Sequence, residues 1–139
     1  MDLLKEMAGL GFPITVFAAA TDAATNGVNA NFSPMMPFDG TITRVLFVPS
    51  AAITANGGNF RTLTVRNKGT NGLAGTTAVA SRAWSAGNSV QSVAEQFALN
   101  ATPANLEVKA GDVLDVNQVA TGTGLIIPAS SYIIYVKPR

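Results

Sequence analysis

The chain has 139 residues, the length of one domain. Nine lysines and arginines nearly balance eight aspartates and glutamates, so the net charge of +1 gives no strong field for nucleic acid or an anionic membrane. Cysteine and histidine are both absent, which excludes disulfides, thiolate zinc sites and histidine-dependent catalytic triads. No apolar run approaches the roughly 20 residues of a membrane span. We therefore expect a non-enzymatic protein with no catalytic residue, no cofactor or metal site, and no nucleic-acid or membrane partner.

Residues 1–13 are predicted to form a short helix or an arm ahead of the main domain. Four apolar side chains recur near helical spacing, and glycines at 9 and 11 end the helix after about two turns. Because so short a helix is marginal alone in water, the segment either packs on its own domain or docks on a neighbouring subunit. The candidate contact residues of this arm are Leu3, Leu4, Met7, Leu10 and Phe12.

From residue 14 onward the apolar period changes to two, which is typical of strands with one buried face. The clearest alternation places Leu63 and Val65 on one face of a strand and Thr64 on the other. Turn-forming glycines and asparagines separate the segments. The predicted strands are 14–21, 35–38, 41–49, 60–67, 76–85, 90–100, 105–109, 113–120 and 131–137. So many short strands without a long helix predict a single all-β sandwich or barrel over 14–139.

The acidic residues are the only candidates for metal or acid–base chemistry. Asp112, Asp115 and Asn117 follow a turn, and their types and spacing partly match the ligands of a calcium-binding loop. No bidentate glutamate follows at the required spacing, so we favour a solvated strand face. An enzyme would have to draw its carboxylates from Glu95, Glu107, Asp112 and Asp115.

Two apolar runs exceed what one core can bury by simple alternation. Residues 45–48 and 132–136 put apolar groups on both faces of their strands, and 125–127 add a third run in a predicted loop. Some of this surface is therefore expected to face another protein, and self-association is the natural way to cover it. The candidate subunit-interface residues are Phe47, Leu125, Ile126, Ile127, Tyr132 and Tyr135.

Four stretches resemble small β-sandwich virion proteins of tailed bacteriophages. They are the run MMPFDGTITRV at 35–45, the strand TLTVR at 62–66, the stretch LEVKAGDVLDV at 106–116 and the closing strand YIIYV at 132–136. Over residues 28–137 the sequence is similar to head decoration, or cement, proteins. The resemblance implies a jelly-roll-like antiparallel sandwich with no catalytic residues.

The resemblance also implies a function and a location. Such proteins assemble as homotrimers near threefold positions of the head and bridge major capsid subunits. We accordingly expect a structural protein on the capsid surface of the virion, assembled in the host cytoplasm, with itself and the major capsid protein as partners. The arm residues would then contact the capsid or a neighbour.

A second class of protein shares these sequence features. A head fibre, spike or tail-associated module that binds a carbohydrate or receptor would have the same sandwich and the same polar surface. Such a module should present several aromatic side chains on one exposed face. The aromatic residues here are scattered over the segments, and core packing explains most of them.

Overall fold

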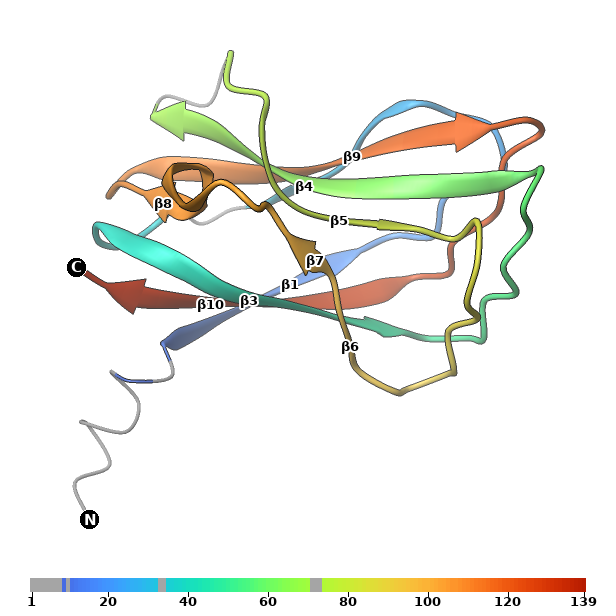
Figure 1. The fold of residues 1–139 in the computed structure, drawn as a ribbon, viewed down its shortest axis with the longest axis horizontal. Coiled ribbons are helices and arrows are strands. Elements are labelled where there is room, and N and C mark those ends of the chain that lie inside the picture. The colour runs from blue at the N-terminus through green and yellow to red at the C-terminus, as the bar shows by residue number, and fades with distance from the viewer. Residues whose placement is uncertain (1–8, 10, 33–34, 71–73) are drawn as a thin grey trace.

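The computed structural model describes residues 9, 11–32, 35–70 and 74–139, and within them ten strands form two antiparallel sheets. The first sheet has the order β1 (Phe12–Ala18), β10 (Ser130–Pro138), β3 (Gly40–Pro49) and β6 (Glu95–Gln96), with β8 (Glu107–Val108) pairing to β3. The second has the order β2 (Gly27–Phe32), β9 (Asp112–Thr121), β4 (Phe60–Thr70), β5 (Thr77–Ala83) and β7 (Ala98–Leu99). The sheets lie one above the other in Figure 1, which confirms the predicted all-β sandwich.

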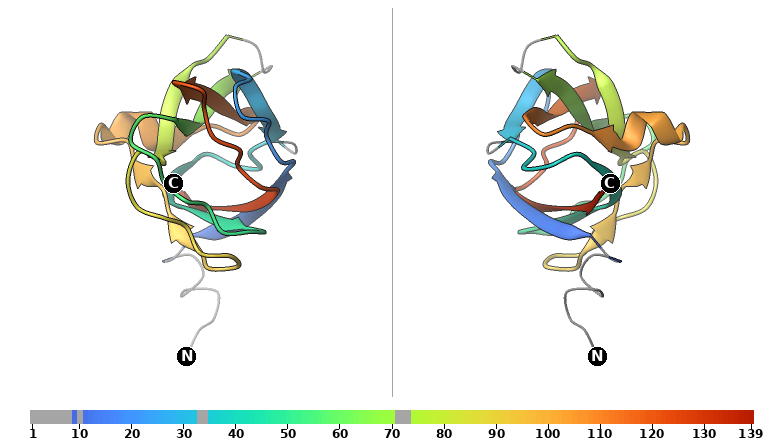
Figure 2. Two further views of the ribbon diagram at one scale, coloured as in Figure 1. Left: turned by 90° about the vertical axis from the view of Figure 1, so that its right-hand side faces the viewer. Right: turned by 90° about the vertical axis from the view of Figure 1, so that its left-hand side faces the viewer.

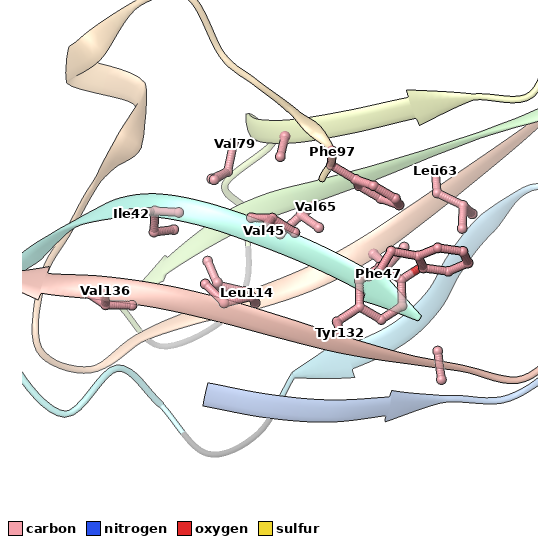
Figure 3. Packing of buried hydrophobic residues seen from close by; sticks show 14 of the residues in the cluster. Ile42, Val45, Phe47, Leu63, Val65, Val79, Phe97, Leu114, Tyr132 and Val136 are labelled. Atoms are coloured by element: carbon pink, nitrogen blue, oxygen red, sulfur yellow. The ribbon is translucent and has the colours of Figure 1, made fainter. Parts of the chain in front are cut away.

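Alternation along each strand separates a core-facing side from an outer side. On β10, Tyr132, Ile134 and Val136 are fully buried, whereas the residues between them are only half-buried. Leu63 and Val65 of β4 behave in the same way, as their sequence pattern predicts. Figure 3 shows Leu63, Val65, Tyr132 and Val136 between the sheets, and Figure 2 shows how the two sheets curve to face each other. Register is firmly set because a one-residue slip would turn every buried side chain outward.

An aromatic cluster fills the centre of the core. The ring centroids of Phe47 and Phe97 lie 5.3 Å apart, and Tyr132 meets Phe97 edge-on at 5.7 Å. Trp84 joins them at 5.4 Å from Phe47, and its indole nitrogen donates a hydrogen bond to Ser89 Oγ. Aromatic pairs at these separations contribute about 0.5–1.5 kcal/mol each beyond the burial of their area. The cluster therefore fastens β3, β10 and the 84–97 segment into one core.

A buried arginine organises one end of the sandwich. The side chain of Arg61, at the start of β4, is fully buried and donates to the carbonyl oxygens of Asp22, Thr25 and Leu125 at 2.5–2.9 Å. It also donates to the Gln118 side chain at 2.6 Å. Buried charge is tolerated only when its donors are satisfied, and here the acceptors come from two loops and one strand. Arg61 thus ties the 22–26 and 122–127 loops to the second sheet.

Three predicted strands are wrong in place or extent. Residues 35–36 have no regular structure and 37–38 form a bend; the amide of Met36 donates to Asp112 O at 2.8 Å, and the strand lies earlier, at β2. Residues 90–100 contain only the short β6 and β7, and 105–109 combine the end of a 3₁₀ turn, Pro103–Leu106, with β8. In each case the residues pair with strands distant in sequence, which local periodicity does not encode.

Candidate interaction face

The outer side of the first sheet presents three aligned rows of side chains, which we call the outer apolar face. One row pairs Thr15 with Ile133 and Ile133 with Leu46 across β1, β10 and β3. The next row toward the loop end contains Phe17, Ser131 and Val48, and the row toward the chain's C-terminus contains Pro13, Tyr135 and Arg44. In these nine positions Arg44 is the one charged residue. The sequence forms this face because β3 and β10 carry apolar residues on both of their sides.

Exposure on this face is highest at Phe17, whose side chain is 80% exposed. Leu46, Val48 and Ile133 are half-buried by their neighbours in the sheet. Arg44 lies over the ring of Tyr135, with its guanidinium carbon 5.4 Å from the ring centroid. A contiguous apolar surface of this kind on a small domain is typical of a contact site for another molecule.

A hollow of about 200 Å³ opens beside Phe17, at the loop end of the outer apolar face. Its lining combines the apolar Phe17 and Val48 with four serines, and the hydroxyl of one of them, Ser130, donates to Pro128 O. Ser92 on its rim has a φ of +61°, a backbone conformation that non-glycine residues rarely adopt. The hollow is lined by Phe17, Val48, Pro49, Ser50, Ser92, Ala129, Ser130 and Ser131. A lining without charge suits a neutral group, either an apolar side chain or a hydroxyl-bearing ring.

The outer side of the second sheet carries charged side chains that are paired across strands. Arg66 of β4 lies opposite Asp115 of β9 and donates to both carboxylate oxygens, at 2.9 and 2.7 Å. Lys68 approaches the same carboxylate at 3.9 Å. The side chain of Asp115 is consequently only 1% exposed, so the prediction of a solvated carboxylate is wrong. Hydrogen bonding to Asp115 raises the pKa of Arg66, which keeps its guanidinium group protonated.

Asp112 is likewise buried and bonded rather than solvated. Its carboxylate accepts hydrogen bonds from Asn67 Nδ2 at 2.9 Å, from the amide of Lys109 at 2.9 Å and from Thr70 Oγ1 at 3.1 Å. Burial raises the pKa of this carboxyl, but the three hydrogen bonds together outweigh burial and leave the pKa below its ordinary value. Asp112 thereby fastens the turn before β9 to the end of β4.

The other two acidic candidates also hold the fold together. Glu95 accepts hydrogen bonds from Ser89 Oγ at 2.9 Å and from Arg82 Nε at 3.2 Å. Glu107 pairs with Arg139 at 3.3 Å. The described residues contain no group of three side chains that could hold a metal ion. Each of the four carboxylates considered from the sequence is therefore engaged with protein groups that link strands or turns.

The predicted arm contacts fall into two groups. Leu3, Leu4, Met7 and Leu10 lie outside the described residues. Phe12 is the first residue of β1, on the same side as Ile14, with its ring 5.7 Å from that of Phe38. The first sheet thus begins two residues before the predicted start of the sandwich domain at residue 14.

Half of the predicted subunit-interface residues are buried in the chain's own core. Phe47, Ile127 and Tyr132 are at most 1% exposed, so the prediction that they contact another subunit is wrong. Alternation turns them inward, while their neighbours in sequence point outward. Leu125 packs partly against the core. The remaining two, Ile126 and Tyr135, reach the surface, and Ile126 is 59% exposed.

Phe17 is the exposed aromatic residue that sequence reasoning missed. Core packing was expected for most aromatic residues, yet Phe17 points outward next to its inward neighbours Val16 and Ala18. The signal was present in the sequence, because in β1 the inward positions are 12, 14, 16 and 18. Reading that alternation strictly would have placed Phe17 outside.

Comparisons with protein-family models, with curated proteins and with solved structures found no match to this chain. No helix among the described residues has the length and apolar character needed to cross a membrane.

Proposed function

We propose that the chain is a non-enzymatic virion structural protein, a decoration or cement protein that binds the outside of a phage head as a homotrimer. In this role it bridges major capsid subunits and stabilises their lattice. Support comes from the sequence resemblance over residues 28–137 and from the carboxylates of Asp112 and Asp115, which accept hydrogen bonds from the protein itself. Its ligand is another protein surface.

The observation that carries the proposal is the outer apolar face. Among the described residues, Phe17 lies exposed on it and Leu46 and Ile133 are covered only in part. Apolar contacts are little affected by salt, and trimeric symmetry repeats each weak contact three times on the lattice. A protein with so little net charge can therefore hold a capsid without electrostatic attraction.

The proposal also assigns the sandwich to the jelly-roll class. Strand order supports this finer assignment, since β1, β10, β3 and β6 form one sheet while β2, β9, β4 and β5 run together in the other. The chain thus crosses between sheets at β1–β2, β2–β3 and β3–β4, as expected for a strand ribbon wrapped around a common core.

Two measurements test the proposal. Light scattering should give about three times the 14.3 kDa mass of the chain. The protein should then sediment with empty heads of the phage that encodes it, and the double variant Phe17→Ser/Ile133→Ser should not. Val119→Ser is the matched control, because Val119 is also an outward-facing apolar residue but lies on the second sheet. Failure of the unaltered protein to bind heads would reject the function.

The hollow beside Phe17 favours one alternative, a head fibre, spike or tail-associated module that binds carbohydrate. An exposed ring next to serine hydroxyls offers a sugar both a stacking surface and hydrogen bonds. A glycan array would test it: binding that is abolished by Phe17→Ala and kept by Val119→Ala would favour this alternative. If the protein binds no glycan on the array, this alternative is rejected.

A further inference from the structure

The size of the outer apolar face limits what can cover it. Three strands spaced by about 4.8 Å and roughly seven residues of each give a patch of about 15 by 25 Å. That is about half of the 800 Å² that each partner contributes to a standard protein–protein interface. Packing this face against the same face of a second domain would therefore bury too little area for a stable dimer. A two-turn helix, about 10 Å wide and just over 10 Å long, fits the patch well.

Charge distinguishes the two ends of the face. Arg44 lies at one end, and the next outward position of β10 there is Lys137. The neighbouring acid on β8, Glu107, is already paired with Arg139. The other end holds Phe17 and the neutral hollow. A segment that matches this face should be apolar along one side and carry acidic residues beside its apolar stripe.

The N-terminal segment of this chain has that composition. Glu6 is three residues after Leu3 and four before Leu10, so a helix would place it beside both. Asp2 lies one helical turn before Glu6 on the same side. The predicted helix would thus offer leucines and Met7 to the apolar rows and carboxylates to Arg44 and Lys137.

Chain connectivity limits how much of the face the chain's own segment can cover. Met7 is four residues from Gly11, a reach of at most about 14 Å. Six residues of extended chain separate Gly11 from Phe17, which is about 20 Å. Met7 of the same chain therefore cannot cover Phe17, the most exposed apolar residue of the face. The arm of another copy has no such restriction.

We propose that residues 1–10 of a second copy of this chain dock on the outer apolar face, with their acidic side toward Arg44 and Lys137. This inference rests on the homotrimer of the proposed function: it assigns the outer apolar face to the contact between subunits, and the assembled trimer is what binds the head. Arm exchange of this kind joins subunits through a short segment, and repetition around a symmetric oligomer adds avidity to a small contact.

Absence of native cysteine allows a clean cross-linking test. The full-length variants Met7→Cys and Ile133→Cys are mixed in equal amounts and oxidised, and mixed disulfides are identified by mass spectrometry. Docking raises the effective concentration of the two thiols toward the millimolar range, so the mixed link should exceed that of the control pair by at least about tenfold. The control pair is Met7→Cys with Val119→Cys, on the outer side of the second sheet.

Three results would overturn the inference. In the first, Met7→Cys links to Val119→Cys as well as it links to Ile133→Cys. In the second, the main product is the disulfide between two Ile133→Cys chains. In the third, the double variant Met7→Cys/Ile133→Cys forms the disulfide within one chain and stays monomeric. Head binding, measured separately, distinguishes this failure from failure of the proposed function. If the protein binds heads but the mixed disulfide does not form, arm exchange is rejected and the proposed function stands. If the mixed disulfide forms but the protein does not bind heads, the proposed function is rejected and arm exchange stands.

Discussion

The two outer sides of this sandwich use similar strands for different purposes. On the second sheet, Arg66 and Asp115 face each other and form a bidentate ion pair, so that side contributes to the stability of the fold. On the first sheet, Ile133 and Leu46 occupy an equivalent central row and have no such polar partners. Under the proposed function, the fold is stabilised on one side of the domain and association takes place on the other, so the two should be separable by mutation.

The largest effect is expected on the polar side. Arg66→Ala should lower the free energy of unfolding by about 3 kcal/mol, because it leaves the buried Asp115 carboxylate without its bidentate partner. Chemical denaturation measures this change. Thr64→Ala, at the preceding outward position of β4, is the control and should change stability by less than about 0.5 kcal/mol. Equal losses in both variants would contradict the assignment of stability to the ion pair.

The next effect is expected on the apolar side and concerns association. Ile133→Ser should weaken self-association by about thirtyfold, or ~2 kcal/mol, the size of a central interface residue. Its free energy of unfolding should fall by only about 1 kcal/mol, because the side chain is already half-exposed. Sedimentation equilibrium gives the first quantity and denaturation the second. The idea fails if Val119→Ser weakens association equally.

A smaller effect should appear in acid. The pKa of Asp112 is lowered in the folded chain, so the unfolded chain binds more protons there as pH falls. Its contribution to stability is full above the ordinary aspartate pKa and is lost as pH falls through the lower folded value. Asp112→Asn should cost about 1 kcal/mol at neutral pH and flatten the pH dependence below pH ~4. Parallel pH profiles for the two proteins would contradict this role.

The smallest effect is expected from salt. Association through an apolar face should change less than about threefold between roughly 0.05 and 0.5 M NaCl, because screening acts on exposed charges. Sizing with light scattering at each concentration provides the test. A tenfold loss of association in high salt would show that Arg44 and Lys137 dominate the contact.

Sequence patterns predicted the fold better than the contacts of individual side chains. Alternation in 62–66 correctly assigned Leu63 and Val65 to the core, and the two-faced character of 132–136 correctly indicated apolar residues outside. The burial of Asp115 was not predictable in this way. Its partner Arg66 is 49 residues away, and only the register of β4 with β9 brings them together.

In a strand that is apolar on both sides, the sequence also does not reveal which residues face the core. Phe47 and Leu46 are equally apolar neighbours, yet one fills the core and the other lies outside. Which side each residue of β3 faces is set by the bulge in the β3–β10 pairing between Tyr135 and Val136 and by the packing of the aromatic cluster. Composition reveals neither of these features. The sequence could therefore say that an apolar face exists, but not which residues form it.

Arg61 gives the loop end of the sandwich a collective behaviour. Its guanidinium group holds Asp22 and Thr25 from one loop and Leu125 from another, so neither loop can open without releasing donors that the other also needs. The two loops should form a single cooperative unit in native-state hydrogen exchange. In Arg61→Met, the amides of Ala120 and Thr123, which donate to side chains at this end, should lose protection together.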